Sequence, residues 1–226
     1  MTKRTFAVIG LGRFGFAMAT TLTDLGHEVI GIDSNEEHVA RISDFVAQAV
    51  QLDATDEKAL RAAGIQDVDV AIISIGERID SSLLVVMLVK ELGIPIIIAK
   101  ATTPLHGRIL EKLGVSRVFF PVRDMAIRVA HSLVVQNVLD YIELSRDFSI
   151  VEIPAPRAFA GRTLRELALR TSYGLTLIAI KRAARPGQGD VTVVAPLADD
   201  RIEKGDVLSL LGSNERLSQL DALLKE

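Results

Sequence analysis

The chain of 226 residues has no cysteine and no tryptophan, and only 4% of its residues are aromatic. The lack of cysteine excludes disulfide bonds, thiolate catalysis and cysteine-based metal sites, and with the lack of a signal peptide it predicts a cytoplasmic protein. Long hydrophobic runs are also missing. The longest are too short and too interrupted to span a bilayer: Val70 to Ile75, Leu83 to Val89 and Ile94 to Ala99.

Neither sign of charge dominates the sequence. There are 26 Lys and Arg against 29 Asp and Glu, a net charge of −3, so no general attraction to nucleic acid or anionic lipid is expected. No basic recognition helix for DNA is found either. The four histidines lack metal-like spacing, so we interpret them as solvent-facing or locally bonded and predict no metal site; they are His27, His38, His106 and His131.

A glycine-rich motif of the form GxGxxG follows the first apolar segment, at Gly10, Gly12 and Gly15. The first glycine allows a sharp turn, the second lets the backbone approach a diphosphate, and the third lets helix and strand pack closely. Asp33 ends the second strand about 20 residues further on, where a carboxylate accepts hydrogen bonds from a ribose and would repel a 2′-phosphate. The motif predicts a nucleotide site at which NADP is disfavoured.

Arg13 adds a full positive charge inside this loop. The N-terminus of the following helix already favours an anion there through its backbone N–H groups and its dipole. A guanidinium can in addition reach a terminal phosphate, or one held by a neighbouring subunit. Arg13 therefore suits ATP or ADP at least as well as NAD. The alternative is that Arg13 lies along its own helix with its charged end in water.

Short apolar runs alternate with amphipathic stretches through the first half of the chain. Continuous apolar runs are typical of parallel strands, which are buried on both faces. The pattern predicts an α/β fold, a Rossmann-like doubly wound parallel sheet. The expected strands are 6–10, 28–33, 47–52, 70–75, 94–99 and 118–121, and the expected helices lie near 13–25, 36–43, 56–63, 80–92 and 104–113.

A longer helix is expected from about Asp124 to Tyr141. Because no strand of the sheet remains for it to return to, we interpret it as a crossover onto a partner domain or subunit. Composition changes near Ser145, and the remaining residues predict a small α+β module. Its expected strands are 149–153, 175–181, 191–195 and 206–211, its helices 163–170 and 213–224, and its hairpin loop 186–189.

Three parts are therefore expected: a nucleotide-binding lobe at 1–122, a crossover helix and linker at 123–146, and a C-terminal lobe at 147–226. A module as small as the last one gains stability when it buries a face against a second copy. A homodimer is therefore expected.

With these elements in place, the chain resembles the cytosolic regulatory subunits of the Ktr and Trk potassium-uptake systems, of the family that regulates conductance of potassium. The resemblance covers nearly the whole chain. Its carriers, in order, are Phe6-Ala-Val-Ile-Gly-Leu-Gly-Arg-Phe-Gly, Gly26-His-Glu-Val, Asp33-Ser-Asn-Glu-Glu, Asp53-Ala-Thr, Ile75-Gly, Lys100-Ala, Asp124-Met, Asn137-Val-Leu-Asp-Tyr-Ile-Glu-Leu-Ser and Tyr173-Gly-Leu-Thr-Leu-Ile-Ala-Ile-Lys.

The resemblance implies homodimers that assemble into a ring, an octamer, on the cytoplasmic face of a membrane potassium-translocating subunit of the KtrB or TrkH type. ATP and ADP would hold the ring in different shapes and so gate potassium flux. The glycine loop and Lys100 would contact phosphates, Asp33 the ribose, and Asp53 with its neighbours the adenine edge. The implied nucleotide-binding residues are Gly10, Leu11, Gly12, Arg13, Phe14, Gly15, Asp33, Ser34, Asn35, Asp53, Ala54, Thr55, Ile75, Gly76, Arg78 and Lys100.

Two further points concern ligands. Some relatives carry a glutamate that helps to place a cation near the terminal phosphate, whereas this chain has Val122 there, and valine cannot ligate a metal. C-lobes of this family can bind cyclic di-AMP across their dimer interface, although an apolar interface is the simpler interpretation. The residues that resemble part of that pocket are Leu167, Arg170, Tyr173 and Gly174.

Two alternative functions remain open. One is an NAD(H)-sensing version of the same regulatory subunit. The other is an NAD-dependent dehydrogenase, which is also built from a Rossmann domain and a second domain. A dehydrogenase needs a general acid or base near the nicotinamide, and the small C-terminal module is poor in such groups. We therefore expect a regulatory protein with no catalytic residue.

Overall fold

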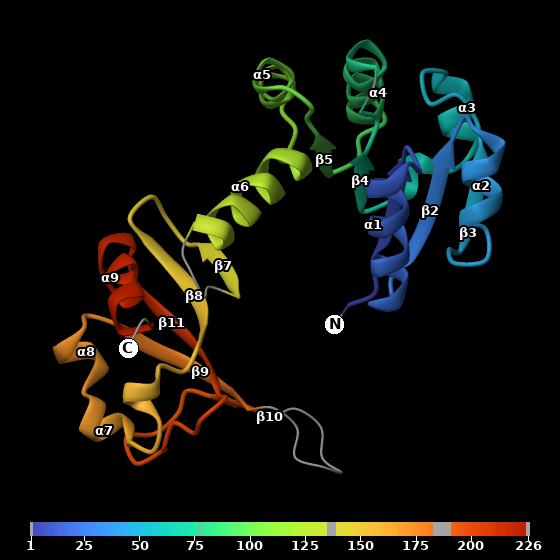
Figure 1. Ribbon diagram of the computed structural model, residues 1–226. Helices are drawn as coiled ribbons and strands as arrows, with labels where there is room; N and C mark the ends of the chain where they lie inside the picture. Colours follow the sequence, from blue (N-terminus) through green and yellow to red (C-terminus); the bar gives the residue numbers. More distant parts are fainter. Residues whose placement is uncertain (1, 77, 135–138, 183–190, 225–226) are drawn as a thin grey trace. The chain divides into compact units, whose positions relative to one another are not determined.

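The computed structural model describes the chain except residues 1, 77, 135–138, 183–190 and 225–226 (Figure 1). It separates into two compact units, Met1–Arg123 and Asp124–Glu226, and each is considered by itself. The hairpin loop predicted at 186–189 lies outside the described residues.

The first unit contains a six-stranded parallel sheet whose order is β3-β2-β1-β4-β5-β6. This confirms the predicted doubly wound sheet, because the strand order reverses between β1 and β4, the switch point at which such sheets bind ligands. Its strands are β1 (Thr5–Ile9), β2 (Glu28–Asp33), β3 (Gln48–Gln51), β4 (Val70–Ile73), β5 (Ile96–Lys100) and β6 (Arg117–Phe119), and its helices are α1 (Arg13–Asp24), α2 (Glu36–Ile42), α3 (Glu57–Ala62), η1 (Ile65–Asp67), α4 (Ile79–Glu91) and α5 (Pro104–Lys112).

Helices cover both faces of this sheet, as the continuous apolar strands require. On one face Val8 and Ile72 pack with Ala19 of α1 and Ile42 of α2. On the other face Ile9 and Ile73 pack with residues of α3, α4 and α5. All four residues of β4 are buried. The carboxyl ends of β1 and β4 are therefore held rigidly beside each other.

The second unit contains a five-stranded antiparallel sheet in the order β10-β9-β11-β8-β7. Helix α6 (Pro121–Val134) begins at the end of the first unit and continues into the second. The other elements are β7 (Asp140–Glu143), β8 (Phe148–Pro154), η2 (Arg157–Phe159), α7 (Leu164–Leu167), α8 (Leu169–Ser172), β9 (Thr176–Arg182), β10 (Val191–Val194), β11 (Val207–Ser213) and α9 (Asn214–Leu224).

The predicted helix from 124 to 141 is wrong at its C-terminal end. Residues 140–143 form strand β7, which pairs antiparallel with β8. Tyr141 points into the core of the second unit, where it is 7% exposed, and its hydroxyl accepts a hydrogen bond from Ser149 Oγ at 2.7 Å. Part of the predicted linker therefore belongs to the second sheet.

The predicted helix at 163–170 is also interrupted. Thr163 begins α7 with a capping box, in which its side chain and that of Glu166 each bind the other's backbone N–H. Ala168 then adopts φ = 46°, a left-handed conformation that ends α7 before α8 starts.

Candidate nucleotide-binding site

The glycine loop connects β1 to α1. Gly10 has φ = +94°, and a Cβ there would lie 3.1 Å from the backbone of Ser74 and Ile75 after β4. A Cβ at Gly15 would lie 1.8 Å from Gly10 O, so only glycine lets α1 come this close to the loop. A Cβ at Gly12 would meet no atom of the described residues within 4 Å. Backbone atoms therefore crowd the loop at Gly10 and Gly15, whereas the space beside Gly12 is open.

Helix α1 begins at Arg13, and Gly12 at its N-cap has no side chain to accept the first amides. Unfilled amides at a helix N-terminus favour an anion. Arg13 is exposed, and within the described part of the chain its guanidinium makes no hydrogen bond or ion pair. The structure therefore places a free cation beside the open end of the loop.

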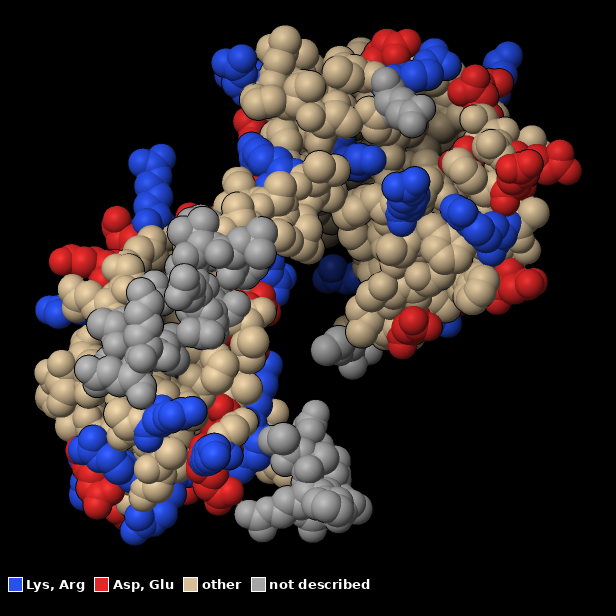
Figure 2. Space-filling view, in the orientation of Figure 1, with Lys and Arg blue, Asp and Glu red and all other residues tan. Residues whose placement is uncertain are grey.

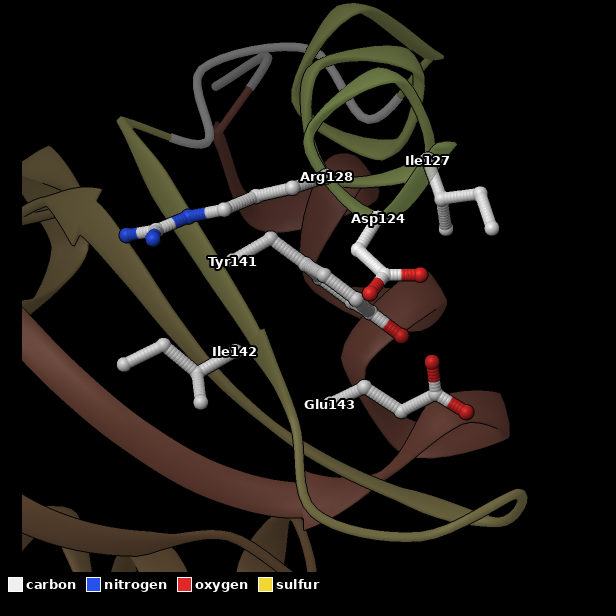
Figure 3. Close-up of a pocket in the computed structure, with 6 residues that line it drawn as sticks. All are labelled: Asp124, Ile127, Arg128, Tyr141, Ile142 and Glu143. Atoms are coloured by element: carbon white, nitrogen blue, oxygen red, sulfur yellow. The ribbon is translucent and has the colours of Figure 1, made fainter. Parts of the chain in front are cut away.

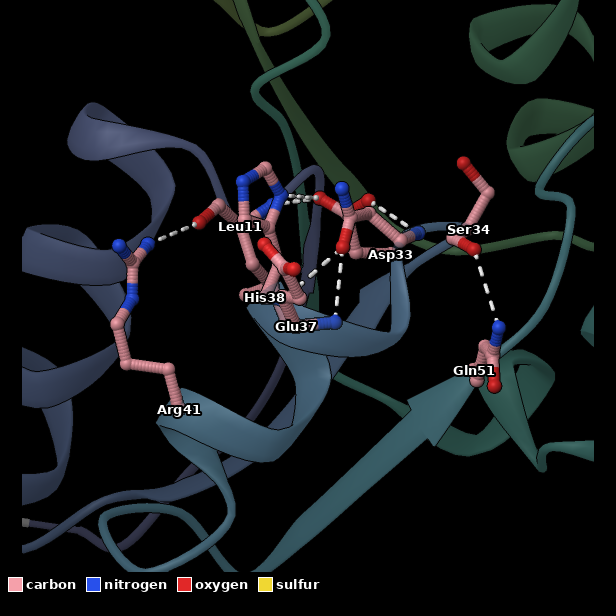
Figure 4. A network of polar contacts seen from close by, with 8 residues as sticks. Leu11, Asp33, Ser34, Glu37, His38, Arg41 and Gln51 are labelled. Carbon is pink, nitrogen blue, oxygen red and sulfur yellow. Dashed lines mark hydrogen bonds and ion pairs between the residues drawn. The ribbon is translucent and has the colours of Figure 1, made fainter.

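Asp33 lies at the end of β2 and bonds to the loop (Figure 4). Its Oδ2 accepts a hydrogen bond from Leu11 N at 2.6 Å and lies 3.1 Å from His38 Nδ1, while Oδ1 accepts one from Asn35 N at 2.9 Å. Burial raises the pKa of Asp33, but the bonds from Asn35, Leu11 and His38 outweigh it, and the pKa lies below its usual value. A carboxylate therefore faces the loop at neutral pH.

The two residues after Asp33 hold the start of α2. Asn35 caps this helix, because its side chain accepts hydrogen bonds from the backbone N–H groups of Glu37 and His38. The carbonyl of Ser34 accepts a hydrogen bond from Gln51 Nε2 at 3.3 Å. The Asn35 side chain thus holds the first turn of α2, and this turn brings His38 within hydrogen-bonding distance of Asp33.

Asp53 and Thr55 form a tight turn after β3, the strand next to β2. Asp53 Oδ1 accepts hydrogen bonds from Thr55 N at 2.9 Å and Thr55 Oγ1 at 2.7 Å, and these bonds lower the pKa of Asp53. Ala54 between them is 8% exposed. This turn follows the carboxyl end of β3, just as the glycine loop follows that of β1 and Asp33 stands at that of β2.

The remaining predicted residues follow β4 and β5. A Cβ at Gly76 would lie 2.6 Å from Lys100 Nζ, so the Lys100 ammonium lies directly over Gly76, which follows β4. Ile75 adjoins Gly10, as described above. Arg78 instead pairs with Asp80 at 3.3 Å and is 73% exposed. The structure therefore brings Gly10, Ile75, Gly76 and Lys100 together.

Sequence reasoning missed two residues of α2. His38 was expected only to be solvent-facing or locally bonded, and Arg41 was not singled out. His38 bonds to Asp33, and Arg41 Nη2 donates a hydrogen bond to Leu11 O at 3.1 Å. Their spacing of three residues puts both on one face of a helix, which is the signal that could have identified them.

The residues predicted for cyclic di-AMP lie in and around α7 and α8 of the second unit. Leu167 is 2% exposed and belongs to the core, and the Tyr173 ring packs against Phe159 with ring centres 5.6 Å apart. Arg170 is exposed. Gly174 has φ = +70°, and a Cβ there would touch Arg216. Two of the four residues thus serve the packing of this unit.

A separate cavity of about 260 Å³ lies between α6 and β7 of the second unit (Figure 3). Arg128 on its wall forms a two-pronged ion pair with Asp140. The pKa of Asp140 is lowered, first by the hydrogen bond from Arg128. The lining residues are Asp124, Ile127, Arg128, Tyr141, Ile142 and Glu143.

The surface and composition of the described residues limit other sites. Basic and acidic side chains are interspersed on the face seen in Figure 2. The described residues contain no group of three or more His, Cys, Asp or Glu that could hold a metal ion. No helix among them has the length and apolar character needed to cross a membrane.

The fold and site define a class: a Rossmann-type nucleotide-binding lobe followed by a small antiparallel lobe. The model of the TrkA-N domain matches residues 6–121, and that of the TrkA-C domain matches residues 148–225. The chain belongs to the family of KtrA- and TrkA-type regulatory proteins of potassium uptake.

The relatives agree with this family, and the solved structures agree with the fold. Ktr system potassium uptake protein C of Bacillus subtilis is 41% identical over 97% of this chain and 96% of its own. Ktr system potassium uptake protein A of Vibrio alginolyticus is 33% identical over 95% of each chain. The GsuK RCK domain, 20% identical, matches the fold with a TM-score of 0.67 over all of this chain and 48% of its own. A GsuK channel bound to NAD, also 20% identical, matches with a TM-score of 0.64 over all of this chain and 40% of its own.

Proposed function

We propose that this chain is a nucleotide-gated regulatory subunit that binds ATP or ADP in its first unit and controls a membrane potassium-translocating subunit of the KtrB or TrkH type. The observation that carries the proposal is the open N-terminus of α1, with the free Arg13 on it and the ionised Asp33 bonded to the same loop. A helix N-terminus receives phosphates, and a carboxylate at this position receives a ribose. The relatives named as Ktr system potassium uptake proteins support the transport role.

The predicted phosphate contacts favour a nucleotide with terminal phosphates. Arg13 and Lys100 supply two cations at the carboxyl ends of β1 and β5, on either side of β4. A γ-phosphate would add charge for both of them. A nucleotide that binds one arrangement of the subunits better than another shifts the balance between arrangements by its differential affinity. ATP and ADP would in this way select different shapes of a ring of homodimers, held in the cytoplasm against the membrane subunit.

NAD(H) is the second candidate ligand. The GsuK channel that was solved with NAD shares the fold of the whole chain, and the ribose of NAD(H) would use Asp33 in the same way. Cyclic di-AMP in the second unit has weaker support, because Leu167 and Tyr173 are engaged in packing and Arg170 is the exposed cation of the set. No catalytic role is proposed for any residue.

Calorimetric titration of nucleotide-stripped protein with ATP, ADP, NADH and cyclic di-AMP tests the proposal. Light scattering on each mixture would follow the size of the particle. Tight binding of ATP and ADP, with distinct heats and a ring-sized particle, is the expected result. Tight binding of NADH to a dimer, with no heat from ATP, would replace the proposed nucleotide by NAD(H).

A further inference from the structure

Asp33 of β2 and Arg41 of α2 hold the two polar backbone atoms of Leu11, the central residue of the glycine loop (Figure 4). Leu11 N donates to Asp33 Oδ2 at 2.6 Å, and Leu11 O accepts a hydrogen bond from Arg41 Nη2 at 3.1 Å. Asp33 itself lies 3.1 Å from His38 of the same helix. The two peptide units that meet at Leu11 are therefore both fixed, one of them by Arg41.

The second of these peptide units, between Leu11 and Gly12, sets the direction of the Gly12 N–H. A trans peptide is planar, with its C=O and N–H on opposite sides. Because Leu11 O is turned toward Arg41, the N–H of Gly12 points away from α2. Within the described residues, Gly12 N donates no hydrogen bond to the protein, and the space beside Gly12 is open. The Gly12 amide is thus unfilled and points away from α2.

The Arg41 guanidinium is itself held in place. It lies over the ring of Phe16 on α1, 4.7 Å from the ring centre, a cation–π geometry. The Phe16 ring meets Phe45 edge-on, with ring centres 5.8 Å apart. Arg41 therefore joins α2 to the loop and to α1 at once.

We propose that Arg41 is a positioning residue for the phosphates of the bound nucleotide. It fixes the Leu11 carbonyl, and through the planar peptide it directs the Gly12 amide toward a diphosphate. This inference rests on the proposed function, since it concerns the same site. The inference separates the roles of two side chains that contact the loop: Asp33 serves the ribose, which every adenosine ligand has, whereas Arg41 serves the phosphates.

The test compares adenosine with ADP, by calorimetry on nucleotide-stripped full-length protein. Arg41→Met keeps the apolar stem but removes the donor. We expect the affinity for ADP to fall by about 5- to 150-fold, the range for the loss of one hydrogen bond from the Gly12 amide to a charged phosphate, while the affinity for adenosine stays within about twofold. Arg61→Met is the matched control, because Arg61 pairs with Glu57 on the exposed side of α3; it should leave both affinities unchanged.

Salt distinguishes positioning from simple attraction by charge. The Debye length is about 3 Å in 1 M salt, so a long-range charge effect would vanish in about 1 M KCl, whereas the loss caused by a misdirected amide would persist. Equal losses for adenosine and ADP, or a deficit that disappears at high salt, would overturn the inference.

Arg41→Lys covers the case in which the methionine variant does not fold. It keeps the charge and a hydrogen-bond donor for the Leu11 carbonyl but lacks the planar stacking on Phe16, so we expect a loss of ADP affinity smaller than that of a variant without any donor, with adenosine affinity unchanged; equal losses for adenosine and ADP in this variant would contradict the inference. Failure of the proposed function has a different signature: unmodified protein would then bind neither adenosine nor ADP, and the inference would fall with it.

Discussion

Asp33→Asn should weaken the binding of every ligand that contains an adenosine ribose. The two amides of Leu11 and Asn35 donate to different oxygens of Asp33. Asparagine has one carbonyl oxygen, so its NH2 group must face one of these donors, and the charge that a ribose diol would bind is lost. A lost hydrogen bond to a charged acceptor is worth about 1 to 3 kcal/mol, which corresponds to about 5- to 150-fold in affinity.

The assay is calorimetric titration of stripped protein with adenosine, ADP and ATP, well below the thermal midpoint of the variant, because the unpaired amide also lowers the free energy of unfolding. We expect the same factor for all three ligands, since all three carry the same ribose. Asp56→Asn is the matched control: Asp56 caps α3, and asparagine caps a helix equally well. Unchanged affinities in Asp33→Asn would refute the reasoning and place the nucleotide elsewhere.

Three further results are expected. Arg13→Ala should reduce the preference for ATP over ADP more than it reduces adenosine binding, and equal losses for the three ligands would count against a phosphate role. Gly15→Ala should lower the free energy of unfolding by more than about 2 kcal/mol, because its Cβ would lie 1.8 Å from Gly10 O; a wild-type denaturant midpoint would contradict this. Asp140→Asn should cost about 1 kcal/mol or less at neutral pH, since its pair with Arg128 is partly exposed. Because the native pKa of Asp140 lies below 3.8, the extra stability of wild type over the variant should be lost as the pH falls below that value. A stability difference that grew in acid would contradict this.

The N-terminal fold could be predicted because its signals are local and repeated. Strands β1, β4 and β5 contain continuous apolar runs, and Val70–Ile73 shows why, since helices cover both of its faces. Strand β7 gives a much weaker signal. It has four residues, of which Tyr141 is buried and Ile142 is 47% exposed, and this alternation is too short to distinguish from the end of an amphipathic helix. The break at Ala168 carries no glycine to mark it.

The sequence predicts those residues of the candidate site that stand at a fixed spacing within one local motif. Gly10, Gly15 and Asp33 have roles that follow from one local βαβ unit. The contact of Arg41 with Leu11 joins residues 30 apart and depends on how α2 packs beside α1. The position of Lys100 over Gly76 likewise depends on the pairing of β4 with β5. Contacts of this kind are set by packing, which no single-sequence pattern contains.

The most direct test of the central claim is potassium flux through vesicles that contain the membrane subunit, with this chain added together with ATP, ADP or no nucleotide. The account predicts a different flux with ATP than with ADP, and a smaller difference with the Arg13→Ala chain. The same flux under all three conditions, with nucleotide shown to be bound, would contradict nucleotide gating.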